Sequence, residues 1–448
     1  RNIRTPANGQ RSTATLVASV GWVRRGGRDL DFSGVIPSFA RETWNLTGTF
    51  QVMSSLRDSP VGSLVPIAGF DARFDEEYQA ESFVPADLPG RIDLPASAWM
   101  VVSEANAELG RLDAAASLIP NPQLVTRIAT RREAVGTSAL EGTYAELTDL
   151  FAAEVLPFEE QEAEVAPNVR EVMNYARAAD AAYGWIGERP ITLGMLASLQ
   201  AEIVRGTDSD GPEAGSIRQS QVFIGAKNRR VSKARFIPPP PGDQLRAMCE
   251  RWVDWLRAVE PVEQIQLIAR VAMAHYQFET LHPFTDGNGR VGRLVAILQL
   301  MHEGALRSPV LSVSPWLKDR ADEYRDHLLA VSTTGDWAPW IEFFAHGVRA
   351  EARSGHERIM RLLALRGQLG DIVRSALPRA RLALEIADDL IAYPILSVSD
   401  AQRRYGRSNQ ANRNAIGSLI ELGVLEPYTD SAYDRLFWNR RVFQIIDS

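Results

Sequence analysis

Apolar residues recur every three to four positions over most of the chain beyond residue 90. This spacing places them on one face of an α-helix, so the pattern predicts a mainly helical protein. The predicted helices cover residues 91–118, 124–138, 167–182, 193–204, 245–259, 262–281, 291–303, 314–331 and 336–366. Strand-like segments are expected at 220–225 and 232–237, which face each other across a tip at 227–230. Four prolines at 238–241 then give this hairpin a stiff, extended exit.

The pattern changes after residue 382. The elements expected there are a helix through Ile391, a short element at 395–398, helices at 399–405 and 409–422, and a strand pair at 425–427 and 437–444. This order is typical of a winged helix-turn-helix. Its basic residues are candidates for contacts with a DNA duplex: Arg403, Arg404, Arg407, Arg413, Arg435, Arg440 and Arg441. Acidic residues are about as numerous, so the module also fits a packing or dimerisation unit.

The composition narrows the class of protein. At 448 residues with 45% hydrophobic content, the chain can bury more than one core, and its length predicts two or three domains. The single cysteine, Cys249, excludes an intramolecular disulfide framework and fits the reducing cytoplasm, where we expect the protein. The net charge of -7 argues against broad nonspecific binding of nucleic acid. No apolar stretch approaches membrane-spanning length, so no membrane partner is expected.

Residues 1–65 differ from the rest of the chain. They begin with Arg1, are rich in Arg, Ser, Thr and Gly, and carry little acid before Asp29. We expect a disordered or non-native extension. Met53 is an alternative translation start, and whether residues 1–52 are natively translated stays open. The ordered protein is expected to begin near Ile67.

The run at residues 282–293, His-Pro-Phe-Thr-Asp-Gly-Asn-Gly-Arg-Val-Gly-Arg, concentrates chemically active groups. Gly287 and Gly289 let backbone N–H groups approach an anion closely, and a helix that begins near Asn288 adds a partial positive charge. Arg290 and Arg293 share one face of that helix and can bind successive phosphates. A phosphorylated substrate is therefore expected at this run.

Three other side chains of the run complete the predicted site. Asp286 is a hard oxygen ligand suited to Mg²⁺, and His282 is free to take a proton. Phe284 is expected to fill the core beneath the loop. The alternative is an ordinary turn with a loop histidine and a solvated arginine face, but the combination at fixed spacing favours the phosphate site.

The run resembles the signature of the Fic (filamentation induced by cAMP) family, HPFx[DE]GNGRxxR, at every defined position. Upstream, Thr137, Glu141 and Gly142 are similar to the family's inhibitory motif, [ST]xxxE[GN]. Because this motif precedes the signature, the chain resembles the class whose inhibitory helix lies N-terminal to the catalytic core.

A flap hairpin is the third point of resemblance. Residues 215–225 and 236–241 are similar to the family's flap and its exit. The target-docking edge of that flap would be Val222, Phe223, Ile224 and Gly225. Arg325 stands where a second tyrosine often follows the one at Tyr324.

The resemblance implies a protein adenylyltransferase, which transfers AMP from ATP to a Ser, Thr or Tyr hydroxyl of a target protein. It makes His282 the catalytic base and Asp286 the Mg²⁺ ligand. The nucleotide-binding residues would be Phe284, Gly287, Asn288, Gly289, Arg290, Arg293 and Tyr324. Glu141 would pair with Arg293 at the position where the γ-phosphate of ATP binds. The resting enzyme is therefore expected to be autoinhibited. Self-modification, for example at Tyr144, is also expected.

The predicted fold is a Fic-type helical bundle with a small β-hairpin flap and a C-terminal winged helix-turn-helix domain. The expected domains are the extension at 1–65, a helical region with the inhibitory helix at 66–165, the Fic core at 166–368 and the winged helix-turn-helix at 379–448. Two other functions stay open at this point. One is a DNA-binding regulator with a weak or vestigial Fic site, and the other is removal of AMP from a protein or another nucleotidyl or phosphodiester transfer. A homodimer also stays open.

Overall fold

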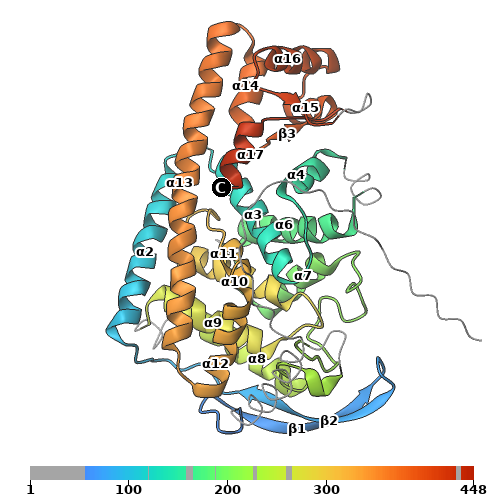
Figure 1. The fold of residues 1–448 in the computed structure, drawn as a ribbon, viewed down its shortest axis with the longest axis vertical. Helices are drawn as coiled ribbons and strands as arrows, with labels where there is room; N and C mark the ends of the chain where they lie inside the picture. Colours follow the sequence, from blue (N-terminus) through green and yellow to red (C-terminus); the bar gives the residue numbers. More distant parts are fainter. Residues whose placement is uncertain are drawn as a thin grey trace, which may run out of the picture. The chain divides into compact units, whose positions relative to one another are not determined.

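A computed structural model of the chain describes residues 56–119, 121–157, 165–186, 188–225, 230–258, 265–429 and 435–448. These residues are mainly helical, as the apolar period predicts (Figure 1). Residues 1–55 of the expected extension lie outside the described residues. Residues 226–229, which include most of the flap tip, also lie outside them. Among the described helices, none is long and apolar enough to cross a membrane.

Two buried helices hold the loop with the active groups. They are α9 (Leu267–Leu281) and α10 (Asn288–His302), and nearly every residue of both is buried. The two helices lie in the core and pack against each other. Phe284, in the loop between them, is buried with its ring centroid 6.4 Å from that of Phe278. The loop is therefore fixed to the core, as the sequence predicts.

Further helices surround this centre. They are α3 (Gln123–Leu140), α6 (Pro167–Trp185), α7 (Leu193–Val204) and α8 (Asp243–Arg257). On another side, α2 (Ala96–Ser117) lies along α13 (Ala338–Ala376) (Figure 1). The indole of Trp340 in α13 is fully buried and donates to the Ala272 carbonyl of α9 at 2.8 Å. This contact ties the α2–α13 pair to the centre.

One predicted helix is divided in the structure, and one observed helix was not predicted. The single helix expected at 314–331 is two helices, α11 (Ser314–Lys318) and α12 (Ala321–Thr334), because Arg320 leaves the helical conformation. The break puts Asp322 and Glu323 in the first turn of α12, where negative charge is favourable. The structure also contains α4 (Leu147–Val155), which the apolar pattern did not single out.

A long antiparallel hairpin, β1 (Gly62–Asp71) and β2 (Glu76–Pro85), was not predicted. Its first strand includes residues 62–65 of the expected extension. The flap, by contrast, has less strand than expected. Its two sides meet in one bridge, Ile224 with Phe236, and the return side begins with a 3-10 turn, η1 (Val231–Lys233). The flap therefore has less strand pairing than a regular hairpin.

The C-terminal elements follow the expected order. They are α14 (Arg381–Asp389), β3 (Ile395–Leu396), α15 (Val398–Tyr405), α16 (Asn409–Glu421), β4 (Glu426–Pro427), β5 (Phe437–Trp438) and α17 (Arg440–Ile446). The three strands form an antiparallel sheet in the order β3-β5-β4. The strand expected at 437–444 becomes helix after Trp438, because Asn439 caps the N-terminus of α17. Arg127 of α3 donates to the Ala392 carbonyl at 3.1 Å, so the module contacts α3.

Candidate active site

His282 stands at the end of α9 in a left-handed conformation, with φ 48° and ψ 61°. Such a conformation is costly for a residue other than glycine and turns the chain sharply into the loop. Its Nδ1 lies 3.2 Å from the Glu279 carbonyl oxygen, which can only accept a hydrogen bond. This contact assigns the ring hydrogen to Nδ1 and leaves the lone pair on Nε2. Burial, and then the charge of Arg218, lower the pKa of His282 to about 4, so the ring is neutral at physiological pH.

The loop after His282 is locked by its own side chains. The Asn288 amide donates to the Phe284 carbonyl at 2.8 Å, and its oxygen accepts from the Phe284 N–H at 2.8 Å. Gly287 has φ 77°, a left-handed conformation that glycine adopts readily. The first turn of α10 therefore begins at a fixed position and orientation.

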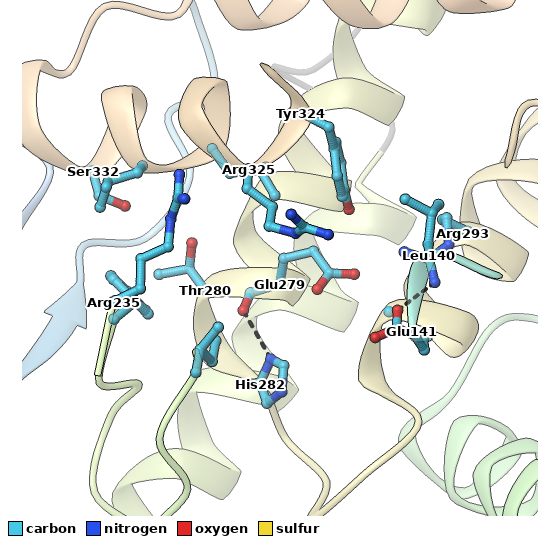
Figure 2. A pocket seen from close by; sticks show the side chains of 15 residues that line it. Leu140, Glu141, Arg235, Glu279, Thr280, His282, Arg293, Tyr324, Arg325 and Ser332 are labelled. Carbon is cyan, nitrogen blue, oxygen red and sulfur yellow. Dashed lines mark hydrogen bonds and ion pairs between the residues drawn. The ribbon is translucent and has the colours of Figure 1, made fainter. Parts of the chain in front are cut away.

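Arg293 and Glu141 meet over this first turn. Arg293 is buried, and its Nη2 donates to Glu141 Oε1 at 2.5 Å (Figure 2). Thr137 orients the guanidinium through its hydroxyl, which accepts from Arg293 Nε at 2.7 Å, and through its carbonyl. Burial alone would lower the pKa of Arg293, but the charges of Glu141, Tyr324 and Glu279, together with the hydrogen bond to Glu141, raise that pKa overall. The guanidinium of Arg293 is thus firmly charged.

Gly289 and Gly142 make this pairing possible. A Cβ on Gly289 would overlap the Glu141 carboxylate, so only glycine lets that carboxylate reach the N-terminal turn of α10. Gly142 has φ 91° and ends α3 directly after Glu141. An anion is stabilised at a helix N-terminus beside a buried arginine. The carboxylate of Glu141 therefore occupies an anion site.

The anion site lies in a pocket that also contains His282 and extends toward the flap and α12. Its walls include Ile224 and Phe236 of the flap, Thr280 of α9, and Leu328 and Ser332 of α12. Tyr324 also lines it, and its hydroxyl lies 2.7 Å from His275 Nε2. His275 is buried.

The pocket brings together part of the predicted site. Of the expected nucleotide-binding residues, Gly289, Arg293 and Tyr324 line it together with His282 and Glu141. Phe284 and Asn288 instead hold the loop, and Arg290 lies 3.3 Å from Glu171 of α6. In the flap, Ile224 lines the pocket, whereas Val222, Phe223 and Gly225 are not part of its walls.

Glu279 is a pocket residue that the sequence analysis missed. Its carboxylate points into the pocket between His282 and Arg293 (Figure 2), and its Oε1 is buried without a hydrogen bond. Burial raises the pKa of Glu279 to about 7. The sequence could have indicated Glu279 through its position three residues before His282, on the last turn of α9, because side chains at this spacing share a face.

Arg218 lies within the expected flap, though no role was predicted for it, and it joins the flap to the loop. Its fully buried side chain donates to the carbonyls of His282 at 2.8 Å, Ser220 at 3.0 Å and Pro239 at 2.5 Å. Its own N–H donates to the Pro283 carbonyl at 2.9 Å. Both ends of the flap are therefore fixed relative to His282.

Asp286 is the residue that could hold a metal ion. Its half-exposed carboxylate accepts hydrogen bonds from the Gly287 N–H at 2.7 Å and from the Ser209 hydroxyl, and lies 3.6 Å from Arg290. Among the described residues, no group of three or more His, Cys, Asp or Glu side chains could enclose a metal. Mg²⁺ commonly binds through one or two carboxylates, with substrate phosphates and water as its other ligands. A single accessible carboxylate beside an anion loop fits that mode.

Comparison with known proteins defines the class of domain. Residues 99–184 match the family model described as Fic/DOC family N-terminal, and residues 190–300 match that of the Fic/DOC family. The chain therefore carries a Fic domain preceded by a Fic N-terminal domain. The resemblance that the sequence shows to this family is confirmed.

Individual relatives are similar over part of their length. The chain is 34% identical over 155 residues to protein adenylyltransferase Fic of Drosophila willistoni, covering 35% of this chain and 27% of that protein. It is 35% identical over 143 residues to protein adenylyltransferase fic-1 of Caenorhabditis briggsae, covering 31% and 24%. The matches thus span about a quarter of these relatives.

Solved structures give similarities at low identity. A crystal structure of a Fic family protein from Desulfovibrio desulfuricans G20 matches 78% of this chain and 97% of its own, with 21% identity and a TM-score of 0.49. A Fic-1 fragment from C. elegans matches 58% and 72%, with 21% identity and a TM-score of 0.42.

Proposed function

We propose that this protein is a protein adenylyltransferase, which transfers AMP from ATP to a hydroxyl group of a protein. One observation carries the proposal: a buried arginine at the N-terminus of α10 and a neutral histidine with a free Nε2 lone pair line the same pocket. The first group suits a terminal phosphate, and the second suits a base for a hydroxyl. The Fic domain and the names of the relatives support the same activity.

The proposed reaction uses these groups in defined roles. His282 Nε2 takes the proton from the acceptor hydroxyl, whose oxygen forms a bond to the α-phosphorus of ATP. The bond from that phosphorus to the bridging oxygen of the β-phosphate breaks, and pyrophosphate leaves. Backbone N–H groups near Gly287 and Gly289 stabilise the charge on the phosphoryl oxygens, and Arg293 binds the γ-phosphate. Asp286 would hold Mg²⁺, which neutralises phosphate charge when bound.

We further propose that the enzyme is autoinhibited. Glu141 has the charge of a terminal phosphate and already bonds Arg293, so the γ-phosphate must compete with it. The competition keeps ATP out of its productive position. Replacing Glu141 with glycine removes the competitor and raises the transfer rate.

The flap offers a docking edge for the target. We propose that an extended target segment adds as a strand along Val222–Gly225 through main-chain hydrogen bonds, which read little sequence. The acceptor hydroxyl then lies near His282, because Arg218 holds the flap at a fixed distance from that loop.

A second candidate function belongs to residues 379–448. We propose that they form a winged helix-turn-helix, and the observation that favours DNA binding is the exposed polar face of α16, with Gln410, Arg413 and Asn414. Amide and guanidinium groups are those that read base edges in the major groove. Most arginines of the module, Arg413 included, bond protein groups, as Arg440 does to Glu426, which limits the phosphate contacts available.

Mass spectrometry of protein acceptors tests the primary function. Cell lysate is incubated with ATP and the Glu141→Gly protein, with the Glu141→Gly, His282→Ala protein as matched control. We expect acceptors that gain the mass of one AMP with the first protein and none with the second. Gain of a phosphate alone, or loss of AMP from proteins that carried it, would identify one of the alternative reactions at this site.

A further inference from the structure

The unpredicted β1–β2 hairpin packs on the flap. Three buried residues of the flap's return side, Val231, Ala234 and Ile237, form a small apolar cluster of their own. The side chains that cover this cluster are Ile67, Tyr78 and Ala80 of the hairpin and Phe223 of the flap. The flap therefore has a core that it shares with the hairpin.

Backbone contacts extend this packing. The Phe83 N–H of β2 donates to the Ile237 carbonyl at 2.9 Å, and the buried Ser82 hydroxyl donates to the Pro238 carbonyl at 2.7 Å. The return side in turn meets the outgoing side at the bridge between Ile224 and Phe236. Hydrogen bonds thus connect the hairpin to the return side of the flap, and the return side to the outgoing side.

An aromatic contact joins the hairpin to the docking edge itself. Tyr78 lies directly opposite Gly69 in the hairpin, and its ring covers the space that a side chain at Gly69 would occupy. The ring then meets Phe223 edge-on, with centroids 5.2 Å apart and an interplanar angle of 86°. The Arg73 guanidinium lies 5.9 Å from the Phe223 ring and is oriented by Asp71.

The contact between Tyr78 and Phe223 also affects the active-site pocket, because side chains alternate along the flap segment. Successive side chains of an extended segment point to opposite sides. Phe223 points to the hairpin, whereas Ile224 lines the pocket with His282. When the hairpin holds the Phe223 ring, the extended segment cannot turn about its own long axis. The side chain of Ile224 and the main-chain groups of the docking edge therefore keep their orientation.

We propose that the β1–β2 hairpin is a positioning element for target recognition, acting through Tyr78 and Arg73 on Phe223. This inference rests on the proposed adenylyltransferase function. Tyr78 is a positioning residue rather than a catalytic one, because it contacts the pocket only through the flap. Loss of its ring loosens the docking edge, while the anion site at Arg293 keeps its geometry.

Four variants in the Glu141→Gly background test the proposal. Tyr78→Ala removes the ring, Tyr78→Phe keeps it, and Arg73→Ala removes the exposed cation without altering the apolar cluster. Phe70→Ala is the matched control, because Phe70 lies on the opposite face of the same hairpin and is 60% exposed. Three quantities are measured: amide hydrogen exchange of the flap, binding of a fluorescent ATP analogue, and AMP incorporation into lysate proteins.

We expect Tyr78→Ala to raise exchange at the Ile224 and Arg235 amides about tenfold and to lower AMP incorporation by a similar factor. Arg73→Ala shifts both in the same direction by a smaller factor. Binding of the ATP analogue stays within about twofold, and Tyr78→Phe and Phe70→Ala match the parent, as a positioning role of the ring requires.

Two results would overturn the inference. One is unchanged flap exchange in Tyr78→Ala and Arg73→Ala, and the other is an equal loss in Phe70→Ala. Absence of any AMP incorporation by the Glu141→Gly parent would contradict the proposed function instead. In that case the exchange data still decide whether the hairpin holds the flap.

Discussion

Replacing Glu141 with glutamine removes one charge and keeps the size of the side chain. Arg293 Nη2 and Glu141 Oε1 are 2.5 Å apart, so at an effective dielectric of about 20 their attraction is about 7 kcal/mol before any correction. The Glu141 side chain is 39% exposed, and solvent screening together with the desolvation of both ions reduces this strongly. A net value of about 1.5–3 kcal/mol is typical for a hydrogen bond that involves charged groups.

This free energy opposes binding of the γ-phosphate, which must displace the carboxylate. Glu141→Gln is therefore expected to tighten ATP binding by about 10- to 150-fold. The affinity is measured by calorimetric titration with ATP in a His282→Ala background, which prevents turnover. Glu146→Gln is the control, since its carboxylate is exposed and lies on the connection that follows Glu141. Equal affinity in wild type and Glu141→Gln would refute the assignment of Arg293 to the terminal phosphate.

Three further outcomes are expected. His282→Asn lowers the rate of AMP transfer in the Glu141→Gly background at least about hundredfold, because the base is lost; rate assays check this. Thermal melts should show an unchanged melting temperature, because asparagine tolerates the left-handed conformation. For Glu279, the folded pKa of about 7 exceeds the ordinary 4.5, so the folded chain holds a proton that the unfolded chain has lost. The free energy of unfolding therefore falls as pH rises from 4.5 to 7, by up to about 3 kcal/mol, and denaturant titrations of Glu279→Gln should lack this fall. Asp286→Asn raises the Mg²⁺ concentration for half-maximal transfer on the order of tenfold, whereas Asp210→Asn does not, as a Mg²⁺ titration would show.

Local signals predict a large part of the fold and of the anion site. The bounds of α7 follow from the sequence, because the hydroxyl of Thr192 accepts from the Met195 N–H and begins the helix there. Glu141 could be placed on the same face as Thr137 from their spacing alone. The glycines of the loop likewise indicate where a backbone approaches an anion.

Other features depend on partners that are distant in sequence. Pro66 and Gly69 interrupt the apolar alternation of β1, so the hairpin carries no clear strand signal, and its apolar face is covered by flap residues far along the chain. The raised pKa of Glu279 arises from burial between α9, α10 and α12, which no local pattern shows. The loop-holding role of Asn288 was equally hidden, because its motif suggests a phosphate contact while its amide bonds Phe284.

Labelled ATP tests the central claim most directly. The Glu141→Gly protein is incubated with lysate and ATP that carries the label on either the α- or the γ-phosphate. We predict that label from the α-position enters protein, that label from the γ-position does not, and that adding His282→Ala abolishes the signal. Incorporation from the γ-position, or equal α-label with and without His282, would contradict AMP transfer by this site.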